Sequence, residues 1–255
     1  MAGFQTHIAV STVTGLGYGL WGYHAGAPLE TCVLAGGLCS VSGMLPDLDS
    51  DSGRPVQEIS SFAAAIVPML MLERFQGFGW PRETIVVAAA GIYALIRFGV
   101  AEIFKRYTVH RGMWHSIPAC LTCGLIAFLI VGGEDLAIRL FKSGAVALGF
   151  LSHLVIDEIW SFQLRSGKLN IKRSFGTALK FWGRDRLANF SVYGKLALVS
   201  FLAVGDPMLM QQFGYNVRFG PQEAKRAADQ AVEQTLESAG IRARPAQPAP
   251  PTFQR

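Results

Sequence analysis

The sequence predicts an all-α integral membrane protein, a bundle of about seven transmembrane helices, with six to eight fitting the same pattern. Of its 255 residues, 51% are hydrophobic and only 16% are charged, and the mean hydropathy is +0.32. A soluble domain carries roughly 25% charged residues. Apolar segments recur along most of the chain with short polar breaks, so we expect one polytopic domain over 1–210 and a tail over 211–255.

Seven apolar segments approach the length of about 20 residues that a spanning helix needs. Glycines in the first two, such as Gly15 and Gly36, predict that these two helices pack closely. The third is short and contains Pro68, and the sixth carries Arg139 and Lys142 in its first turns, where long side chains can reach the membrane interface. Re-entrant segments are the alternative for both. The seven cover 6–24, 29–46, 59–75, 83–104, 113–132, 136–157 and 190–210.

The remaining segments and the cysteines add little chemistry. Pro221 to Ala239 predicts a polar helix, and Pro245 to Pro251 a disordered extension. The four cysteines all fall inside apolar segments, where a thiol behaves as a small buried hydrophobe. A redox pair of Cys120 and Cys123 is the weaker alternative, because it would lie in a membrane helix rather than beside a strand.

Basic residues predict the orientation of the bundle. If the helices alternate in direction, the loops 47–58, 105–112 and 158–189 share the side of the N-terminus, and they hold eleven Lys and Arg residues. The opposite loops hold two, or four with Arg139 and Lys142. Because cytoplasmic loops carry the excess of basic residues, we expect a multi-pass protein of the inner membrane with a cytoplasmic N-terminus. Six more basic residues lie from 211 onward, so the side of the tail stays open.

The formal charge of +5 is explained by this clustering, so we expect membrane lipids and no nucleic acid as partners. The loop 158–189 interleaves basic residues with Phe175, Phe181 and Trp182. This pattern suits a helix on the surface of an anionic leaflet, although a topology signal alone is an equal alternative.

Ionisable residues gather at the segment ends that share the N-terminal side. Such residues are expensive at membrane depth and mark functional sites. His153 and Asp157 are four residues apart, so a helix places both on one face. Asp47, Asp49 and Asp51 alternate along the chain, and an extended turn would direct several carboxylates inward.

Histidines complete this group. His7 begins the first segment, and His110 and His115 precede the fifth. His24, seventeen residues after His7, would lie about 25 Å away at the other side. Each residue alone fits a helix cap or a hydrogen-bonded core position. Together they predict one or two divalent ions, since imidazole with carboxylate suits zinc, iron or manganese.

Three motifs resemble the signature of the YdjM-like, LexA-regulated membrane-bound metal-dependent hydrolases. They are Leu45-Pro46-Asp47-Leu48-Asp49, His110-Arg111-Gly112 with His115-Ser116, and Ser152-His153 with Asp157. The resemblance covers roughly residues 1–160. Met113-Trp114 departs from it, because a small hydroxyl residue is common before the histidine. The resemblance implies an inner-membrane, metal-dependent hydrolase whose ligands would be His7, Asp47, Asp49, His110, His115, His153 and Asp157.

Three further residues are catalytic candidates. Arg111 would steady a phosphate or a developing oxyanion, or else anchor a helix at the interface. Asp51 or Glu158 would be the general base, although a solvated loop acid is the favoured alternative. Ser116 is expected only to form a hydrogen bond at the start of a helix.

The sequence thus predicts a hydrolase that uses zinc or manganese on a phosphoester or lipid-linked substrate at the cytoplasmic face. A metal-independent lipid-phosphate phosphatase with a histidine nucleophile shares the His-x-x-x-Asp ending, but the chain has no Ser-Gly-His element. A metal-ion transporter or sensor would place its ligands near the bilayer midplane rather than at helix ends. The pattern leaves the substrate and the oligomeric state open.

Overall fold

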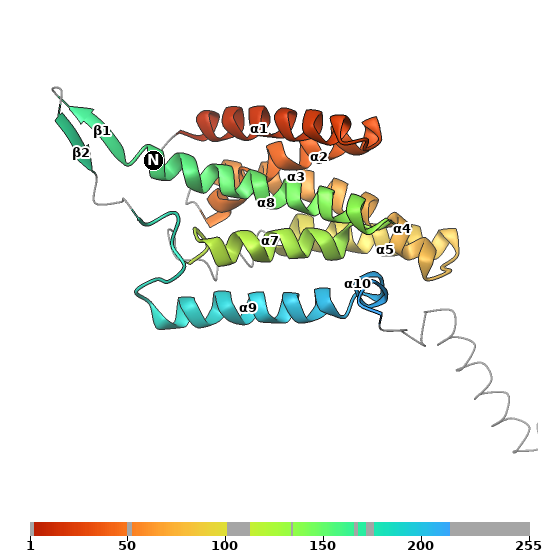
Figure 1. The fold of residues 1–255 in the computed structure, drawn as a ribbon. Coiled ribbons are helices and arrows are strands. Elements are labelled where there is room, and N and C mark those ends of the chain that lie inside the picture. Colours follow the sequence, from red (N-terminus) through yellow and green to blue (C-terminus); the bar gives the residue numbers. More distant parts are fainter. Residues whose placement is uncertain are drawn as a thin grey trace, which may run out of the picture. The chain divides into compact units, whose positions relative to one another are not determined.

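Helices follow the predicted apolar segments in chain order (Figure 1). The computed structural model describes residues 3–49, 53–100, 113–133, 135–165, 168–171 and 176–214. The elements are α1 (Phe4–His24), α2 (Leu29–Ser42), η1 (Leu45–Asp49), α3 (Gly53–Leu70), α4 (Leu72–Gly77), α5 (Arg82–Ala94), η2 (Leu95–Val100), α7 (Ile117–Ile130), α8 (Leu136–Ile159), β1 (Phe162–Arg165), β2 (Lys168–Ile171), α9 (Arg186–Val204) and α10 (Pro207–Gln212).

Within the described ranges, three stretches are long and apolar enough to cross a membrane. They are Leu29–Asp47, which joins α2 to η1, and the whole of α8 and α9. The helix α7 is apolar but shorter. The prediction of a helical protein with membrane-spanning segments is therefore confirmed, whereas the number of seven spans stays a prediction. Neither α3 nor α8 turns back on itself.

Close glycine contacts join α1 to α2, as predicted. A Cβ atom on Gly15 would collide with the carbonyl oxygen of Gly36, and one on Gly19 would come within 2.9 Å of the carbonyl oxygen of Cys32. The hydroxyl of Ser11 donates a hydrogen bond of 2.7 Å to the carbonyl of Ser40. Small side chains thus let the two backbones approach, which orders the start of α1 relative to the end of α2.

The helices α8, α7 and α9 lie side by side and alternate in direction (Figure 1). Each begins at a polar cap: Ser116 accepts a hydrogen bond from the amide of Ala119, Asp135 from that of Ala137, and Asp185 from that of Leu187. Such caps satisfy amide groups that have no partner inside the helix. The role expected of Ser116 is confirmed.

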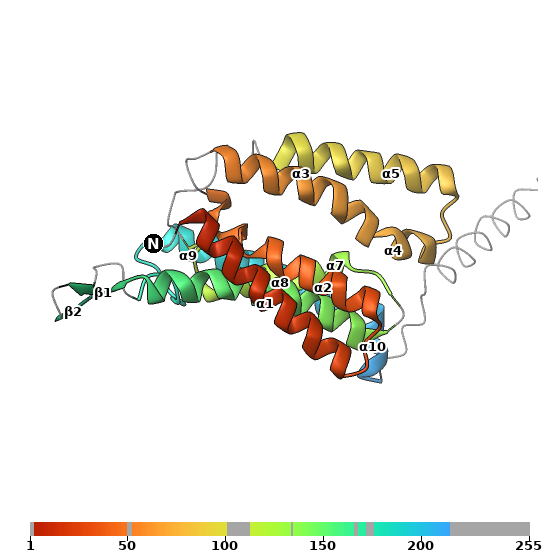
Figure 2. The same cartoon turned by 90° about the horizontal axis from the view of Figure 1, so that it is seen from above.

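The helices α3 and α5 pair with each other at one side of the molecule (Figure 2). Pro68 lies inside α3 without ending it. At the far end of α3, the amide of Gly132 donates a hydrogen bond of 3.1 Å to the carbonyl of Leu70, which links α3 to the end of α7.

Two predictions about polar segments were wrong. Arg139 does not extend to the interface: it is 3% exposed and forms an ion pair of 2.8 Å with Asp206. The described part of 158–189 contains an antiparallel hairpin, β1 with β2, and no surface helix. Phe162 pairs with Ile171 and Arg165 with Lys168. The described residues 176–185, which include Phe181 and Trp182, form turns and bends rather than a helix.

The four cysteines, all within the described ranges, are buried and unpaired. Cys120 donates a hydrogen bond through Sγ to the carbonyl of Ala147 at 3.2 Å, so it serves the contact between α7 and α8. Contacts divide the chain into one unit at Met1–Tyr215 and another at Asn216–Arg255. The predicted helix from Pro221 to Ala239 and the predicted extension from Pro245 to Pro251 lie outside the described residues.

Candidate metal centre

Five of the predicted ligands meet at one end of the bundle. We call them the His/Asp cluster: His7, Asp47, His115, His153 and Asp157. The first turn of α1, the last turns of α8 and the short η1 supply four of them, and His115 stands just before the cap of α7. The histidines and Asp157 are 1% to 6% exposed. Convergence of separate helix ends, on which the metal hypothesis depended, is observed.

His153 lies at the centre of the cluster. Its Nδ1 is 2.7 Å from the carbonyl oxygen of Gly43. A carbonyl can only accept, so Nδ1 carries the proton and the lone pair of neutral His153 is on Nε2. Nε2 lies 3.6 Å from Oδ1 of Asp47 and 3.6 Å from Oδ2 of Asp157, and among the described residues it has no hydrogen-bond partner. This orientation is the one that second-shell carbonyls give to metal-binding histidines.

His7 lies against both members of the α8 pair. Its Nε2 is 3.3 Å from Oδ1 of Asp157, and its ring stacks on that of His153 with centroids 3.6 Å apart and planes 12° from parallel. Two imidazolium ions would repel each other at this separation. Neutral imidazole is the form that binds metals.

His115 and Asp47 approach from the other side. Nε2 of His115 is 3.9 Å from Oδ1 of Asp47, and its ring centroid is 5.7 Å from that of His153. Trp114 helps to fix this region, because its Nε1 donates a hydrogen bond of 2.9 Å to the carbonyl of Leu45. Trp114, one of the two residues that differ from the family pattern, thus links the segment before α7 to the start of η1.

The distances suit shared coordination of a metal ion. Two atoms that each lie about 2.0–2.2 Å from one zinc ion are at most about 4.4 Å apart, and the four nitrogen–oxygen separations are 3.3 to 3.9 Å. Two groups of potential donors, each within 4.8 Å, share His153: His7 with Asp47 and His153, and His115 with His153 and Asp157. The buried Nε2 of His153, which faces two carboxylates and forms no hydrogen bond within the described residues, and the mixed donor set both fit a divalent ion.

The other candidates are placed differently. Asp51, His110 and Arg111 lie outside the described residues, as does the side chain of Asp49. The predicted extended turn at 47–51 was wrong in its described part, because Leu45–Asp49 is a 3₁₀ helix that winds the chain and directs Asp47 to the cluster. His24 is exposed at the opposite end of α1, as expected.

Glu158 follows Asp157 in α8 but has partners of another kind. Its carboxylate accepts hydrogen bonds from the amides of Gly176 and Ala178, the latter at 3.4 Å. Both partners belong to the loop before α9, so these contacts favour a structural role. The hypothesis that Glu158 is a general base stays a prediction.

Sequence reasoning missed two contributors to this region. One is the carbonyl of Gly43, which orients His153 and carries no side-chain signal. The other is the pair of buried serines beside it, since a Cβ atom on Gly43 would collide with Ser11 and one on Gly149 with Ser42. Small residues of α1, α2 and α8 at these places let the three helices meet under the cluster.

Comparison with known protein families finds a match over the part of the chain that holds the His/Asp cluster. A family model described as YdjM inner membrane protein matches residues 1–178. This range contains all five residues of the His/Asp cluster. No curated protein and no solved structure matches the chain.

Proposed function

This chain belongs to the YdjM inner membrane protein family, and from this premise we propose that it is a membrane-embedded, metal-dependent hydrolase. The observation that carries the proposal is the His/Asp cluster, whose donor groups share the buried Nε2 of His153. Buried ionisable groups at membrane depth are costly unless they are paired or bind a ligand. Coordination of one or two divalent ions, zinc or manganese by the chemistry of the donors, would satisfy all five side chains at once.

Each residue has a defined part in this hypothesis. Nε2 of His153 faces both carboxylates, and Gly43 holds the ring in the required tautomer. His7 and Asp157 would close the inner side of the site, where burial excludes bulk water. A bound divalent ion acts as a Lewis acid and supplies hydroxide near neutral pH.

Access to the cluster is from the side of Asp47. Its side chain is 24% exposed, whereas those of the other four are at most 4% exposed. A substrate would therefore reach the cluster past η1. We propose a phosphoester or lipid-linked substrate, since an anionic oxygen would complement an ion held by histidines.

The test is metal content and hydrolysis in one set of purified proteins. We expect zinc or manganese in the wild type by elemental analysis, together with hydrolysis of bis-p-nitrophenyl phosphate. His153→Ala should lower metal affinity by more than the about 10–100-fold that loss of an outer-shell partner causes, and abolish hydrolysis. His24→Ala is the matched control, a histidine of α1 at the opposite end, and should change neither.

Other outcomes would overturn the proposal in different ways. Hydrolysis that persists in metal-free protein and requires His153 would favour a histidine-nucleophile phosphatase. Metal accumulation inside vesicles without hydrolysis would favour a transporter. Equal metal content in wild type and His153→Ala would show that the cluster is not the binding site.

A further inference from the structure

An apolar pocket of about 230 Å³ lies between α2, α3, α7 and α8. Apolar side chains make up nearly all of its wall, among them Leu38 of α2, Ala63 and Ile66 of α3, and Ala127 of α7. None of its lining residues is charged. Because an apolar cavity of about 150 Å³ can hold a benzene molecule, this space suffices for a hydrocarbon segment.

The pocket is continuous with the residues that position the His/Asp cluster. Trp114, which lines it, precedes His115, and Ser42 precedes Gly43, whose carbonyl orients His153. Leu45 also lines it and lies two residues before Asp47 in η1, about 4 Å of rise in a 3₁₀ helix. The end of the pocket thus adjoins the most exposed ligand of the cluster.

The opposite end of the pocket reaches toward the far side of the bundle. Leu70 at the end of α3 and Val131 just after α7 line it there. Along α3 the lining residues run from Phe62 to Leu70, and along α7 and its C-cap they run from Cys123 to Val131, eight residue steps in each case. Eight residues of helix rise about 12 Å, so the pocket is elongated along the helix axes.

Two of the lining side chains are also exposed on the surface of the bundle. Phe62 of α3 and Ile126 of α7 are each 39% exposed. The edge of the pocket is thus formed in part by exposed apolar side chains of α3 and α7. In a membrane protein, an apolar edge of this kind can contact a lipid chain without moving a polar group into hydrocarbon.

From this arrangement we propose that the pocket binds one hydrocarbon chain of a lipid phosphate whose anionic head group lies at the His/Asp cluster. This inference rests on the proposed function and narrows its substrate to an amphiphile. The charge pattern matches such a molecule: an uncharged wall along the chain, and a histidine-lined centre suited to a cation and hence to phosphate at one end. A water-soluble phosphoester would leave the apolar wall without a partner.

Two photoactivatable lipids test the proposal in vesicles that contain the full-length, zinc-loaded protein. Both carry the same diazirine-bearing acyl chain; one is a phosphatidic acid and the other a phosphatidylcholine. We expect the phosphatidic acid to label lining residues of α3 and α7 more strongly, because only its head group is a phosphomonoester. Ala63→Trp should reduce this labelling by about tenfold or more, since a filled cavity imposes the cost of overpacking on the chain.

Ala65→Trp is the matched control on the same helix, at an exposed position outside the pocket, and should leave the labelling unchanged. Equal labelling by both lipids would overturn the assignment of the head group to the His/Asp cluster. Equal labelling of both tryptophan variants would overturn the claim that the pocket binds the acyl chain. Zinc content of the same samples reports on the proposed function separately. If the protein binds zinc but the lining residues are not labelled, the metal site is supported and the lipid-binding proposal is wrong.

Discussion

At the scale of single residues, Arg74, Arg139 and Asp206 form a second buried polar network besides the His/Asp cluster. Arg139 and Arg74 both donate to the carboxylate of Asp206, at 2.8 to 3.0 Å, and both donate to the carbonyl of Phe128. The guanidinium of Arg139 also lies 4.3 Å from the ring centroid of Phe128. The network joins α4, α7, α8 and the cap of α10, because Asp206 also accepts from the amide of Met208.

This network makes stability depend on pH. Burial acts to raise the pKa of Asp206, but the hydrogen bonds from Arg139 and Arg74 outweigh it and hold the pKa below its usual value. The stabilisation is therefore complete above the unfolded pKa of about 3.9 and is lost as the pH falls through the lower folded value. We expect the thermal unfolding midpoint in detergent to fall between about pH 5 and pH 3, and Asp206→Asn to flatten part of that decline.

The comparison with the variant separates Asp206 from other carboxylates that titrate in the same range. At neutral pH, Asp206→Asn should also lower the free energy of unfolding, by up to about 3 kcal/mol, because it leaves a buried Arg139 without its counter-ion. If the thermal unfolding midpoints of the wild type and the variant fall by the same amount from pH 5 to pH 3, this account is contradicted.

The two networks differ in how far the sequence predicts them. His153 and Asp157 are four residues apart on one helix, and His7 begins another, so periodicity and alternating direction bring them to one end. Arg139 and Asp206 are 67 positions apart, and Arg74 lies 132 positions from Asp206. Only the packing of α9 along α7 brings Asp206 to these arginines, and a lone Arg in the first turn of an apolar segment suggests solvent contact instead.

At the scale of helices, the contact of α1 with α2 sets the position of His7. Gly15 and Gly17 lie on the same helix, but a Cβ atom on Gly15 would collide with Gly36 whereas one on Gly17 meets nothing within 4 Å. We expect Gly15→Ala to lower the free energy of unfolding by about 1–3 kcal/mol through overpacking. Gly17→Ala should be neutral or raise it by up to about 1 kcal/mol, because Ala favours helix over Gly.

Denaturation in mixed micelles followed by circular dichroism measures both variants. Since α1 carries His7, the displaced helix in Gly15→Ala should also weaken metal binding, and Gly17→Ala should not. Equal stability of the two variants would show that the helices adjust to the added methyl group without separating.

Helices were easier to predict than the connections between them. Long apolar runs define α8 and α9, and the capping residues Asp135 and Asp185 define where each begins. The hairpin of β1 and β2 has only four residues in each strand, too few for an alternating pattern to stand out. The Leu-Pro-Asp-Leu-Asp stretch winds into η1 after a two-residue turn at the end of α2, which alternating carboxylates alone do not indicate.

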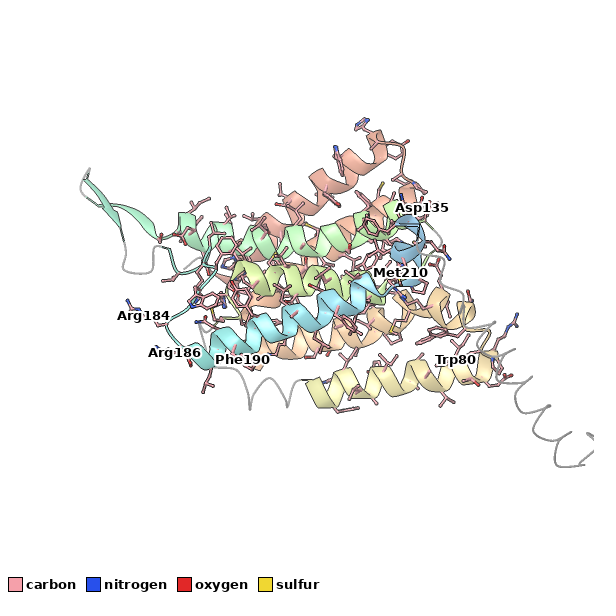
Figure 3. All side chains as sticks on the ribbon, turned by 60° about the horizontal axis from the view of Figure 1, so that its bottom comes forward. Trp80, Asp135, Arg184, Arg186, Phe190 and Met210 are labelled. Atoms are coloured by element: carbon pink, nitrogen blue, oxygen red, sulfur yellow. The ribbon has the colours of Figure 1, made fainter. Side chains whose placement is uncertain are left out.

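At the scale of the whole described unit, the bundle has two chemically distinct ends. Fourteen residues of α8 separate Arg139 from His153, about 21 Å of helical rise. In Figure 3, Asp135 and Met210 lie at one end of the bundle, and Arg184 and Arg186 at the other, with Phe190 near the start of α9. Since Gly183 lies against Met113, two residues before His115, these exposed arginines share the end of the His/Asp cluster.

This asymmetry permits a direct test of orientation. The loops of the cluster end hold eleven basic residues, so we predict that this end faces the cytoplasm. Asn170 in β2 and Gln211 in α10 flank α9, which is long and apolar enough to cross a membrane. A cysteine at Asn170 should be protected from an impermeant maleimide in intact cells and react after lysis, whereas one at Gln211 should react in intact cells.

The four native cysteines are buried, so the unmodified chain provides a background of low reactivity. Labelling at Asn170 but not at Gln211 would reverse the orientation and put the His/Asp cluster on the periplasmic side. Equal labelling at both positions would mean that α9 does not cross. Only protection at Asn170 with reaction at Gln211 agrees with a lipid phosphate that meets the cluster from the cytoplasmic leaflet, because the cluster and the adjoining end of the pocket then lie at that leaflet.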